Sequence, residues 1–257
     1  MTVLKSFLKI LNWQTLIILI ISLAATYLCR IYNFTADFPL TLVGIAVVFP
    51  LVFSINSAYK RRETALAHYG TLKGNARAIS YASRDWIENP DPKKIVEVKG
   101  VINKLFSAIN NYLHTKRDES LKDENIVLES FHDLSLEIKD FREQGMSGSE
   151  VSRSNQYLSK MIIAFEQIKH IYQYRTPLTL RAYSKIFIAI LPVIYGPYFA
   201  EVTMTKSLAI AFILPALFSV VLVSLDNIQE HLENPFDKIG EDDISINSEK
   251  FIKGLEF

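Results

Sequence analysis

Four long runs without a charged residue constrain this chain more than any other feature. They cover residues 10–29, 38–59, 186–200 and 207–225, and they contain 20, 22, 15 and 19 residues. An α-helix rises about 1.5 Å per residue, so about 20 apolar residues cross the hydrocarbon core of a bilayer. Helices of soluble proteins usually keep one polar face, and four helices without one are rare in such proteins. The runs therefore predict four membrane-spanning helices.

Basic residues flank these runs on one side of the membrane. Lys5 and Lys9 precede the first run, and Lys60–Arg62 follow the second, whereas the two short connectors carry few charges. Lys- and Arg-rich flanks stay in the cytoplasm, so we expect both termini and the long middle segment inside a plasma (inner) membrane. The short third run lengthens upstream if it includes Arg181 and Lys185. A charge at mid-bilayer costs about 3 kcal/mol, so we place both near the water boundary.

The middle segment, residues 63–175, contains no further spanning run. Its apolar residues recur at helical spacing in three stripes: Ile102, Leu105, Phe106, Ile109, Tyr112 and Leu113; Ile126, Phe131, Leu134, Ile138 and Phe141; Val151, Leu158, Ile162, Phe165, Ile168 and Tyr172. No alternating strand pattern is present. The prediction is an all-α protein with a transmembrane pair at 1–62, a cytoplasmic helical domain at 63–175, a second transmembrane pair at 176–226 and a polar cytoplasmic tail at 227–257.

Composition excludes several functional classes. The chain has 28 basic and 27 acidic residues, which argues against nucleic acid as a partner because phosphate binding needs a basic excess. The single cysteine, Cys29, excludes an internal disulfide and a Cys-rich zinc site. Motifs of phosphate-binding loops, zinc proteases and serine hydrolases are absent, and the five histidines are scattered. We therefore predict no enzyme, no catalytic residue and no cofactor.

The second run carries a stripe of large apolar residues. Ile45, Phe49 and Phe53 are four residues apart, so on an α-helix they lie nearly in line, with ~40° of drift per step. Such a row fits a lipid-facing surface or a helix contact. If several copies surround an axis, each residue instead forms a ring, and stacked apolar rings make a narrow neck that gates by dewetting. Asn56 would then add a polar ring below the neck.

Two properties of this run bear on ion flow. Pro50 leaves the carbonyl of Ala46 without its helical donor, which predicts a bend or local loosening. Phenyl edges carry partial positive charge and favour a weakly hydrated anion, whereas phenyl faces favour a cation. Ion preference therefore depends on ring orientation.

Three motifs resemble signatures of the bestrophin family. Residues 53–70 read FSINSAYKRRETALAHYG and match the family's segment at the end of span two, with Asn56, Ala58, Tyr59, Arg61 and Gly70 in register. Ser54, Arg62 and Tyr69 depart from it. After span four, Glu233, Asn234, Pro235 and Phe236 followed by Asp243 and Ile244 resemble the family's Asn-Pro-Phe and its acidic stretch. A weaker match is Thr176-Pro177-Leu178 before span three.

The resemblance implies a homopentameric ion channel with four spans per subunit around one central pore. It places the neck at Ile45, Phe49 and Phe53, and a second, cytoplasmic constriction near Val151. Animal members bind calcium through the acidic stretch, which corresponds here to Asp242 and Asp243, although the inserted residues 237–240 depart from their pattern. The alternative interpretation of this acidic cluster is a solvent-exposed turn that binds no metal. Membrane lipid and permeating ions are the other expected partners.

Other functions stay open at this point. We expect chloride or another small anion to permeate, and a cation-selective channel of the same architecture is the alternative. The long amphipathic middle segment also fits a membrane-anchored helical scaffold or sensor that binds a partner. A weaker hypothesis is a membrane enzyme that uses Asp226, Glu230, His231 or Glu233 near the bilayer edge.

Overall fold

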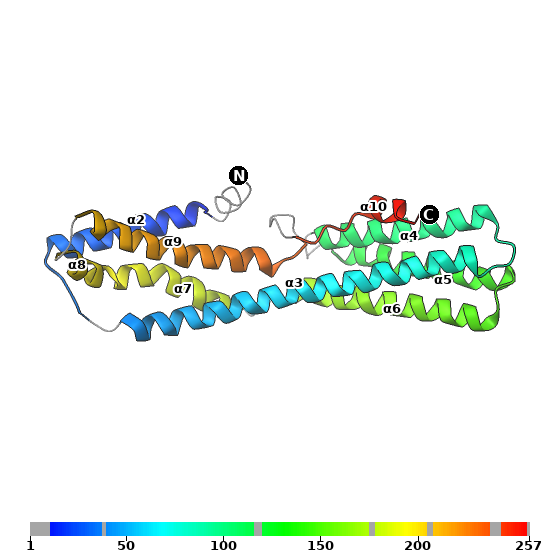
Figure 1. Ribbon diagram of the computed structural model, residues 1–257, viewed down its shortest axis with the longest axis horizontal. Helices are drawn as coiled ribbons and strands as arrows, with labels where there is room; N and C mark the ends of the chain where they lie inside the picture. The colour runs from blue at the N-terminus through cyan, green and yellow to red at the C-terminus, as the bar shows by residue number, and fades with distance from the viewer. Residues whose placement is uncertain are drawn as a thin grey trace. The chain divides into compact units, whose positions relative to one another are not determined.

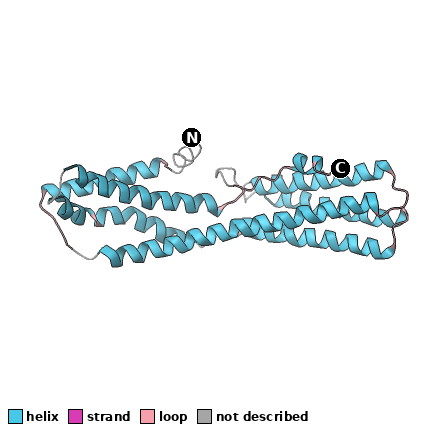
Figure 2. Cartoon of the chain, viewed as in Figure 1, coloured by secondary structure: helices cyan, strands magenta, loops and turns pink. Residues whose placement is uncertain are grey.

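The computed structural model describes residues 11–37, 40–115, 120–174, 178–204, 208–236 and 243–255. All regular structure within these ranges is α-helical, and no strand occurs in them (Figure 2). The predicted all-α class is confirmed. The chain divides into two compact units: residues 1–60 with 176–233, and residues 61–175 with 234–257. The first unit contains the predicted transmembrane runs and the second contains most of the predicted cytoplasmic domain.

The first unit consists of helices α2 (Trp13–Ile31), α7 (Leu178–Ile194), α8 (Gly196–Met204), α9 (Leu208–Glu233) and the first part of α3 (Leu40–Asp85). Helices α2, α7, α8 and α9 pack side by side (Figure 1). Three segments are long and apolar enough to cross a membrane: Trp13–Ile31, Arg181–Val202 and Phe212–Glu233. The predicted span at 38–59 is not among them, so the count of four spans stays a prediction, and residues 38 and 39 lie outside the described ranges.

The third predicted span is interrupted in the structure. Helix α7 ends at Ile194 and α8 begins at Gly196, because Pro197 has no backbone N–H to donate to the preceding turn. A Cβ added at Gly196 would lie 3.3 Å from the backbone carbon of Ala25, so glycine permits the close approach of α8 to α2. The segment Arg181–Val202, which includes most of both helices, is still long and apolar enough to cross a membrane, as predicted for the third run.

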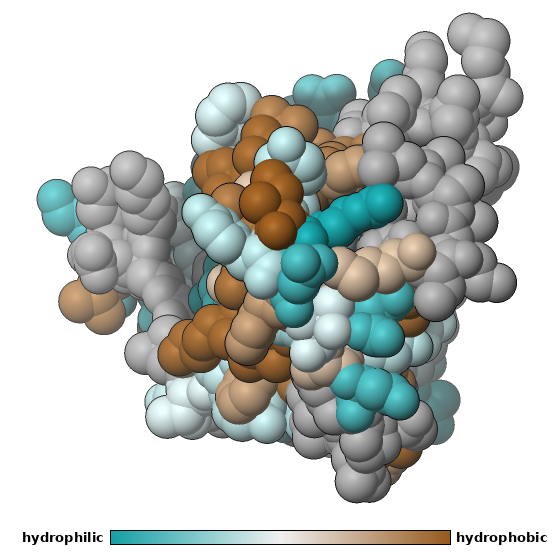
Figure 3. Space-filling model, turned by 90° about the vertical axis from the view of Figure 1, so that its left-hand side faces the viewer, coloured by the Kyte–Doolittle hydropathy of each residue, from teal (hydrophilic) through white to brown (hydrophobic). Residues whose placement is uncertain are grey.

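The charges expected near the water boundary are paired inside the first unit. Arg181 on α7 contacts Glu233 on α9 with an N···O distance of 2.9 Å, and Lys185 contacts Glu230 at 3.3 Å. Glu233 retains only 4% of its side-chain exposure. Ion pairing between α7 and α9 therefore explains how this helix accepts two basic residues. From the end that carries α8, Figure 3 shows hydrophobic residues gathered at the surface beside hydrophilic ones.

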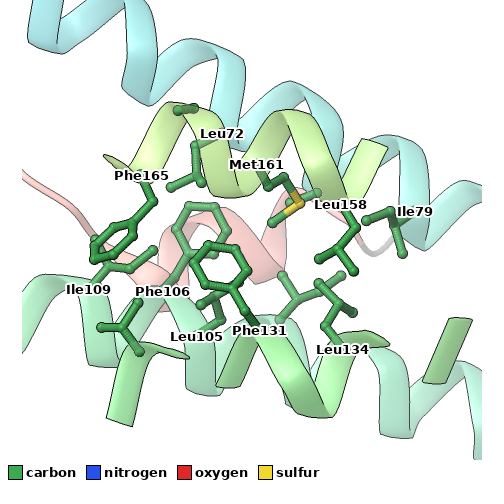
Figure 4. Packing of buried hydrophobic residues seen from close by; sticks show 14 of the residues in the cluster. Leu72, Ile79, Leu105, Phe106, Ile109, Phe131, Leu134, Leu158, Met161 and Phe165 are labelled. Carbon is green, nitrogen blue, oxygen red and sulfur yellow. The ribbon is translucent and has the colours of Figure 1, made fainter. Parts of the chain in front are cut away.

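The second unit contains the rest of α3 together with α4 (Pro92–His114), α5 (Ser120–Glu143), α6 (Gly148–Gln173) and α10 (Ser248–Lys253). The apolar side chains of these helices point toward one another in a single core (Figure 4). All six residues of the first predicted stripe are buried, so that stripe is confirmed. In the second stripe Ile126 is 45% exposed, and Val127 occupies the core in its place.

The end of the chain also belongs to this core. Ile244, Ile246, Phe251 and Leu255 are buried in it. The ring of Phe251 stacks on that of Phe106 with centroids 4.6 Å apart, and the guanidinium of Arg77 lies over the Phe251 ring, 5.9 Å from its centroid. The prediction of a polar tail was wrong for residues 243–255. Their few apolar side chains are separated by polar ones, so the segment looks polar in the sequence. The helices on which these side chains pack lie far away along the chain.

Candidate functional site

Helix α3 has two contrasting faces within the first unit. Val47 and Leu51 are 3% and 1% exposed, and they belong to one buried hydrophobic cluster with residues of α7, α8 and α9. Ile45, Phe49 and Phe53 point away from this core and are 56%, 61% and 54% exposed. The structure thus places the three predicted neck residues on one outward, apolar face. Because one side of α3 is buried in the first unit, its other side is available to lipid or to another subunit.

The outward face forms a shallow apolar hollow of about 420 Å³, lined by Gly44, Ile45, Val48, Phe49 and Val52. The rings of Phe49 and Phe53 meet edge to face, with centroids 4.6 Å apart and planes inclined by 76°. Val48 and Val52 were not predicted to belong to this site. Their spacing of three from Ile45 and Phe49 was the available signal, because residues three and four apart share a helix face.

Polar residues follow the apolar stripe on α3. Asn56, predicted to form a ring below the neck, is exposed, and so are Tyr59 and Lys60. Pro50 lies inside the helix between Phe49 and Phe53. Sequence reasoning used Lys60 only for topology. Its position seven residues after Phe53 was the signal that it continues the stripe.

Arg61 holds the end of another helix in the second unit. Its guanidinium donates a hydrogen bond to the carbonyl of Ile171 at 2.8 Å and another to the carbonyl of Tyr174. Both carbonyls belong to the C-terminal end of α6, where backbone acceptors lack helical partners and a cation is favoured. This contact gives the motif residue Arg61 a structural role that links α3 to α6.

The Asn-Pro-Phe motif also has a structural role. Phe236 is 1% exposed in the core of the second unit, and Pro235 is buried beside it. The backbone N–H of Ile244 donates to the carbonyl of Pro235 at 2.7 Å. This bond joins the segment that contains Asn234 to the acidic stretch and the end of the chain.

The predicted cytoplasmic constriction and the predicted calcium site both stay predictions. Val151, near the predicted cytoplasmic constriction, lies in the first turn of α6 and is half-buried against the core of the second unit. Of the predicted calcium ligands, Asp243 is partly buried and Asp242 lies outside the described residues, as do Thr176 and Pro177. Within the ranges that the structure describes, no group of three or more His, Cys, Asp or Glu side chains is placed to hold a metal ion.

Comparison with known proteins gives a clear result for the fold alone. No protein-family model and no curated protein matches this chain. A structure of the bacterial bestrophin homologue from Klebsiella pneumoniae, phased by Zn-SAD, has a TM-score of 0.72 and 17% identity, and covers 95% of this chain and 96% of that one. A tryptophan-to-alanine variant of that homologue has a TM-score of 0.77 and 16% identity, over 94% and 95%. This chain has a bestrophin-like, all-α fold, and three of its helical segments are long and apolar enough to cross a membrane.

Proposed function

We propose that this chain is the subunit of an ion channel that passes small anions, chloride among them, through an apolar neck. The observation that carries the proposal is the outward face of α3, where Ile45, Phe49 and Phe53 are each more than half exposed. Large apolar side chains one turn apart form stacked rings when several copies surround an axis. The bestrophin-like fold supports this interpretation, because the resemblance assigns the neck to the same three residues.

The proposal requires several identical subunits, since one α3 has only one such face. We propose a homopentamer in the plasma (inner) membrane with both termini in the cytoplasm, with lipid against the other apolar faces. Helices α2, α7 and α9 also expose large apolar residues, including Ile20, Ile186 and Leu217. These surfaces have the length and composition of lipid-facing helices.

The test is chloride flux from liposomes that contain the purified full chain. The double variant Phe49→Ala, Phe53→Ala widens the neck, so we expect faster flux than through the wild-type protein. Ile213→Ala with Leu217→Ala on α9 is the matched control, because these residues are 54% and 57% exposed. The control should leave the flux unchanged.

Two results would contradict the proposal. The first is an absence of flux of any ion through both the wild-type and the neck variant. The second is a monomer by mass measurement in detergent, since a symmetric pore needs several subunits. A monomer that co-purifies with a stoichiometric partner would instead favour a membrane-anchored scaffold or sensor.

A further inference from the structure

Helix α6 has one continuous exposed side in the second unit. Its members recur at intervals of three and four residues, which places them on a single face of an α-helix. This outer face of α6 consists of six exposed residues: Arg153, Gln156, Lys160, Ile163, Gln167 and His170. The opposite side of the same helix, with Leu158, Phe165 and Ile168, is buried in the core. The outer face is therefore the part of α6 that can meet a partner or solvent.

The outer face of α6 carries positive charge and no carboxylate. Arg153 and Lys160 are seven residues apart, so they lie about 20° apart around the helix axis and about 10 Å apart along it. The two acidic residues of this helix are engaged elsewhere: Glu166 pairs with Lys169 at 2.6 Å, and Glu150 accepts a hydrogen bond from the N-cap serine at 3.0 Å. Among the residues that the structure describes, no acidic side chain pairs with Arg153 or Lys160.

The neighbouring helices of the second unit mix the two signs of charge. The exposed charged residues of α4 and α5 include Lys93, Glu97, Lys104, Lys122, Glu129, Lys139, Arg142 and Glu143. Neither helix therefore offers a row of carboxylates that would neutralise the outer face of α6 in another copy of the chain. Charges without a partner are costly to bury in a protein interface. Cationic and amide side chains on an exposed face fit water and small anions better.

The C-terminal end of α6 lies beside α3, the helix that carries the proposed neck. Arg61, eight positions after Phe53 in the sequence, donates hydrogen bonds to the carbonyls of Ile171 and Tyr174. These bonds hold the end of α6 against the part of α3 that belongs to the second unit. The outer face of α6 thus begins next to the continuation of the neck helix.

We propose that the outer face of α6 lines the aqueous cytoplasmic part of the ion passage, where Arg153 and Lys160 concentrate small anions. This inference rests on the proposed channel function. Charge of one sign along an aqueous cleft raises the local concentration of counter-ions, and rings of Lys or Arg favour anions in pores. The neck then limits the flow, and the outer face of α6 raises the concentration of anions that reach it.

The experiment measures chloride conductance and reversal potentials of the full chain in planar bilayers. Arg153→Gln with Lys160→Gln should lower the ratio of chloride to potassium permeability by about two- to fivefold, because a unit charge about 4–8 Å from an ion in water changes the local ion concentration by such a factor. Arg153→Lys with Lys160→Arg keeps both charges and should preserve the ratio. Lys139→Gln with Arg142→Gln is the matched control, since it removes two exposed charges from α5, and it should leave the ratio unchanged.

Salt separates an electrostatic role of these residues from a structural one. The Debye length is about 10 Å at 0.1 M ionic strength and about 3 Å at 1 M. The loss of chloride conductance in the double glutamine variant should therefore be present in about 0.1 M KCl and nearly absent in about 1 M KCl. An equal loss at both concentrations would overturn the inference, because a distorted channel conducts poorly at any salt concentration.

A cysteine on the outer face tests whether water and ions reach it. Lys160→Cys on a Cys29→Ser background can be labelled in the bilayer, where a cationic thiol reagent should restore the wild-type permeability ratio and an anionic reagent should lower it further. A cysteine that stays unreactive in conducting channels would show that another protein surface covers the face, and this result would overturn the inference. An unchanged ratio in conducting channels of the double glutamine variant would do the same. Failure of the proposed function appears differently, as a wild-type protein without conductance.

Discussion

The guanidinium of Arg61 donates a hydrogen bond to the backbone carbonyl of Ile171, 110 residues further along the chain, at 2.8 Å. A second bond from the same side chain reaches the carbonyl of Tyr174. Helix ends leave up to four carbonyls without intrahelical donors, and a cation satisfies them while opposing the negative end of the helix dipole. Arg61 therefore stabilises the C-terminal end of α6.

Replacing Arg61 should weaken this helix end. Arg61→Ala removes both donors, and hydrogen bonds from charged groups contribute about 1.5–3 kcal/mol in favourable cases. Because the side chain is half-buried, we expect a loss of ~1–3 kcal/mol in the free energy of unfolding. Hydrogen exchange should show faster opening of the last turn of α6. Arg153→Ala, at an exposed position on the same helix, is the control, and equal protection in both variants would contradict the assignment.

Breaking the ion pair between Arg181 and Glu233 should destabilise the first unit more than a surface pair would. The two side chains are 23% and 4% exposed, and removing one partner of a buried pair typically costs about 3–5 kcal/mol because the other charge is left uncompensated. Arg181→Met and Glu233→Leu together should cost less than the sum of the single variants. A double-mutant cycle of unfolding in detergent measures this coupling; additive effects would argue against it.

The stack of Phe251 on Phe106 should hold the end of the chain to the second unit. Phe251 is 6% exposed, and truncating a buried Phe to Ala typically costs about 3–5 kcal/mol. We expect Phe251→Ala to make residues 243–255 accessible to limited proteolysis while α4 remains protected. Lys253→Ala, exposed in the same helix, should cleave like the wild type. Identical cleavage of the two variants would show that the stack does not hold this segment.

The stability of the second unit should depend on the ionisation of Glu137. Desolvation raises the pKa of this carboxyl, and Lys94 opposes the shift. An acid with a raised pKa in the folded state binds its proton more tightly there, so its ionisation lowers stability above that pKa and protonation removes the penalty as the pH falls. Glu137→Gln should therefore raise the melting temperature near pH 8 and have little effect near about pH 4. Glu143→Gln, at an exposed position, should show no such pH-dependent gain.

The packed faces of the cytoplasmic helices could be predicted where the apolar spacing is regular. Ile102, Leu105, Phe106 and Ile109 follow intervals of three, one and three, and all four are fully buried. The error at Ile126 has a geometric reason. A spacing of five residues places it about 140° around the helix from Phe131, whereas Val127, four residues before Phe131, shares its face. A less regular stripe therefore assigned one residue to the wrong side.

The candidate site could be predicted only as far as one helix determines it. The stripe of Ile45, Phe49 and Phe53 follows from local periodicity, and the structure places it on an exposed face. The partners of Arg61 and the docking of Phe251 join segments more than 100 residues apart, and no local pattern encodes such pairs. Ring formation depends on neighbouring subunits, which a single sequence does not specify.

Pro50 has a mechanical consequence for this helix. It lies inside α3 between Phe49 and Phe53, and it removes the hydrogen bond that would otherwise stiffen the turn back to Ala46. Bending therefore concentrates at this turn. Ile45 lies on one side of this turn and Phe53 on the other, so in the proposed pore a small swing of the first segment would change the diameter at Ile45 while leaving it nearly constant at Phe53. Such a pore would widen from one end, without any rearrangement of the surrounding bundle.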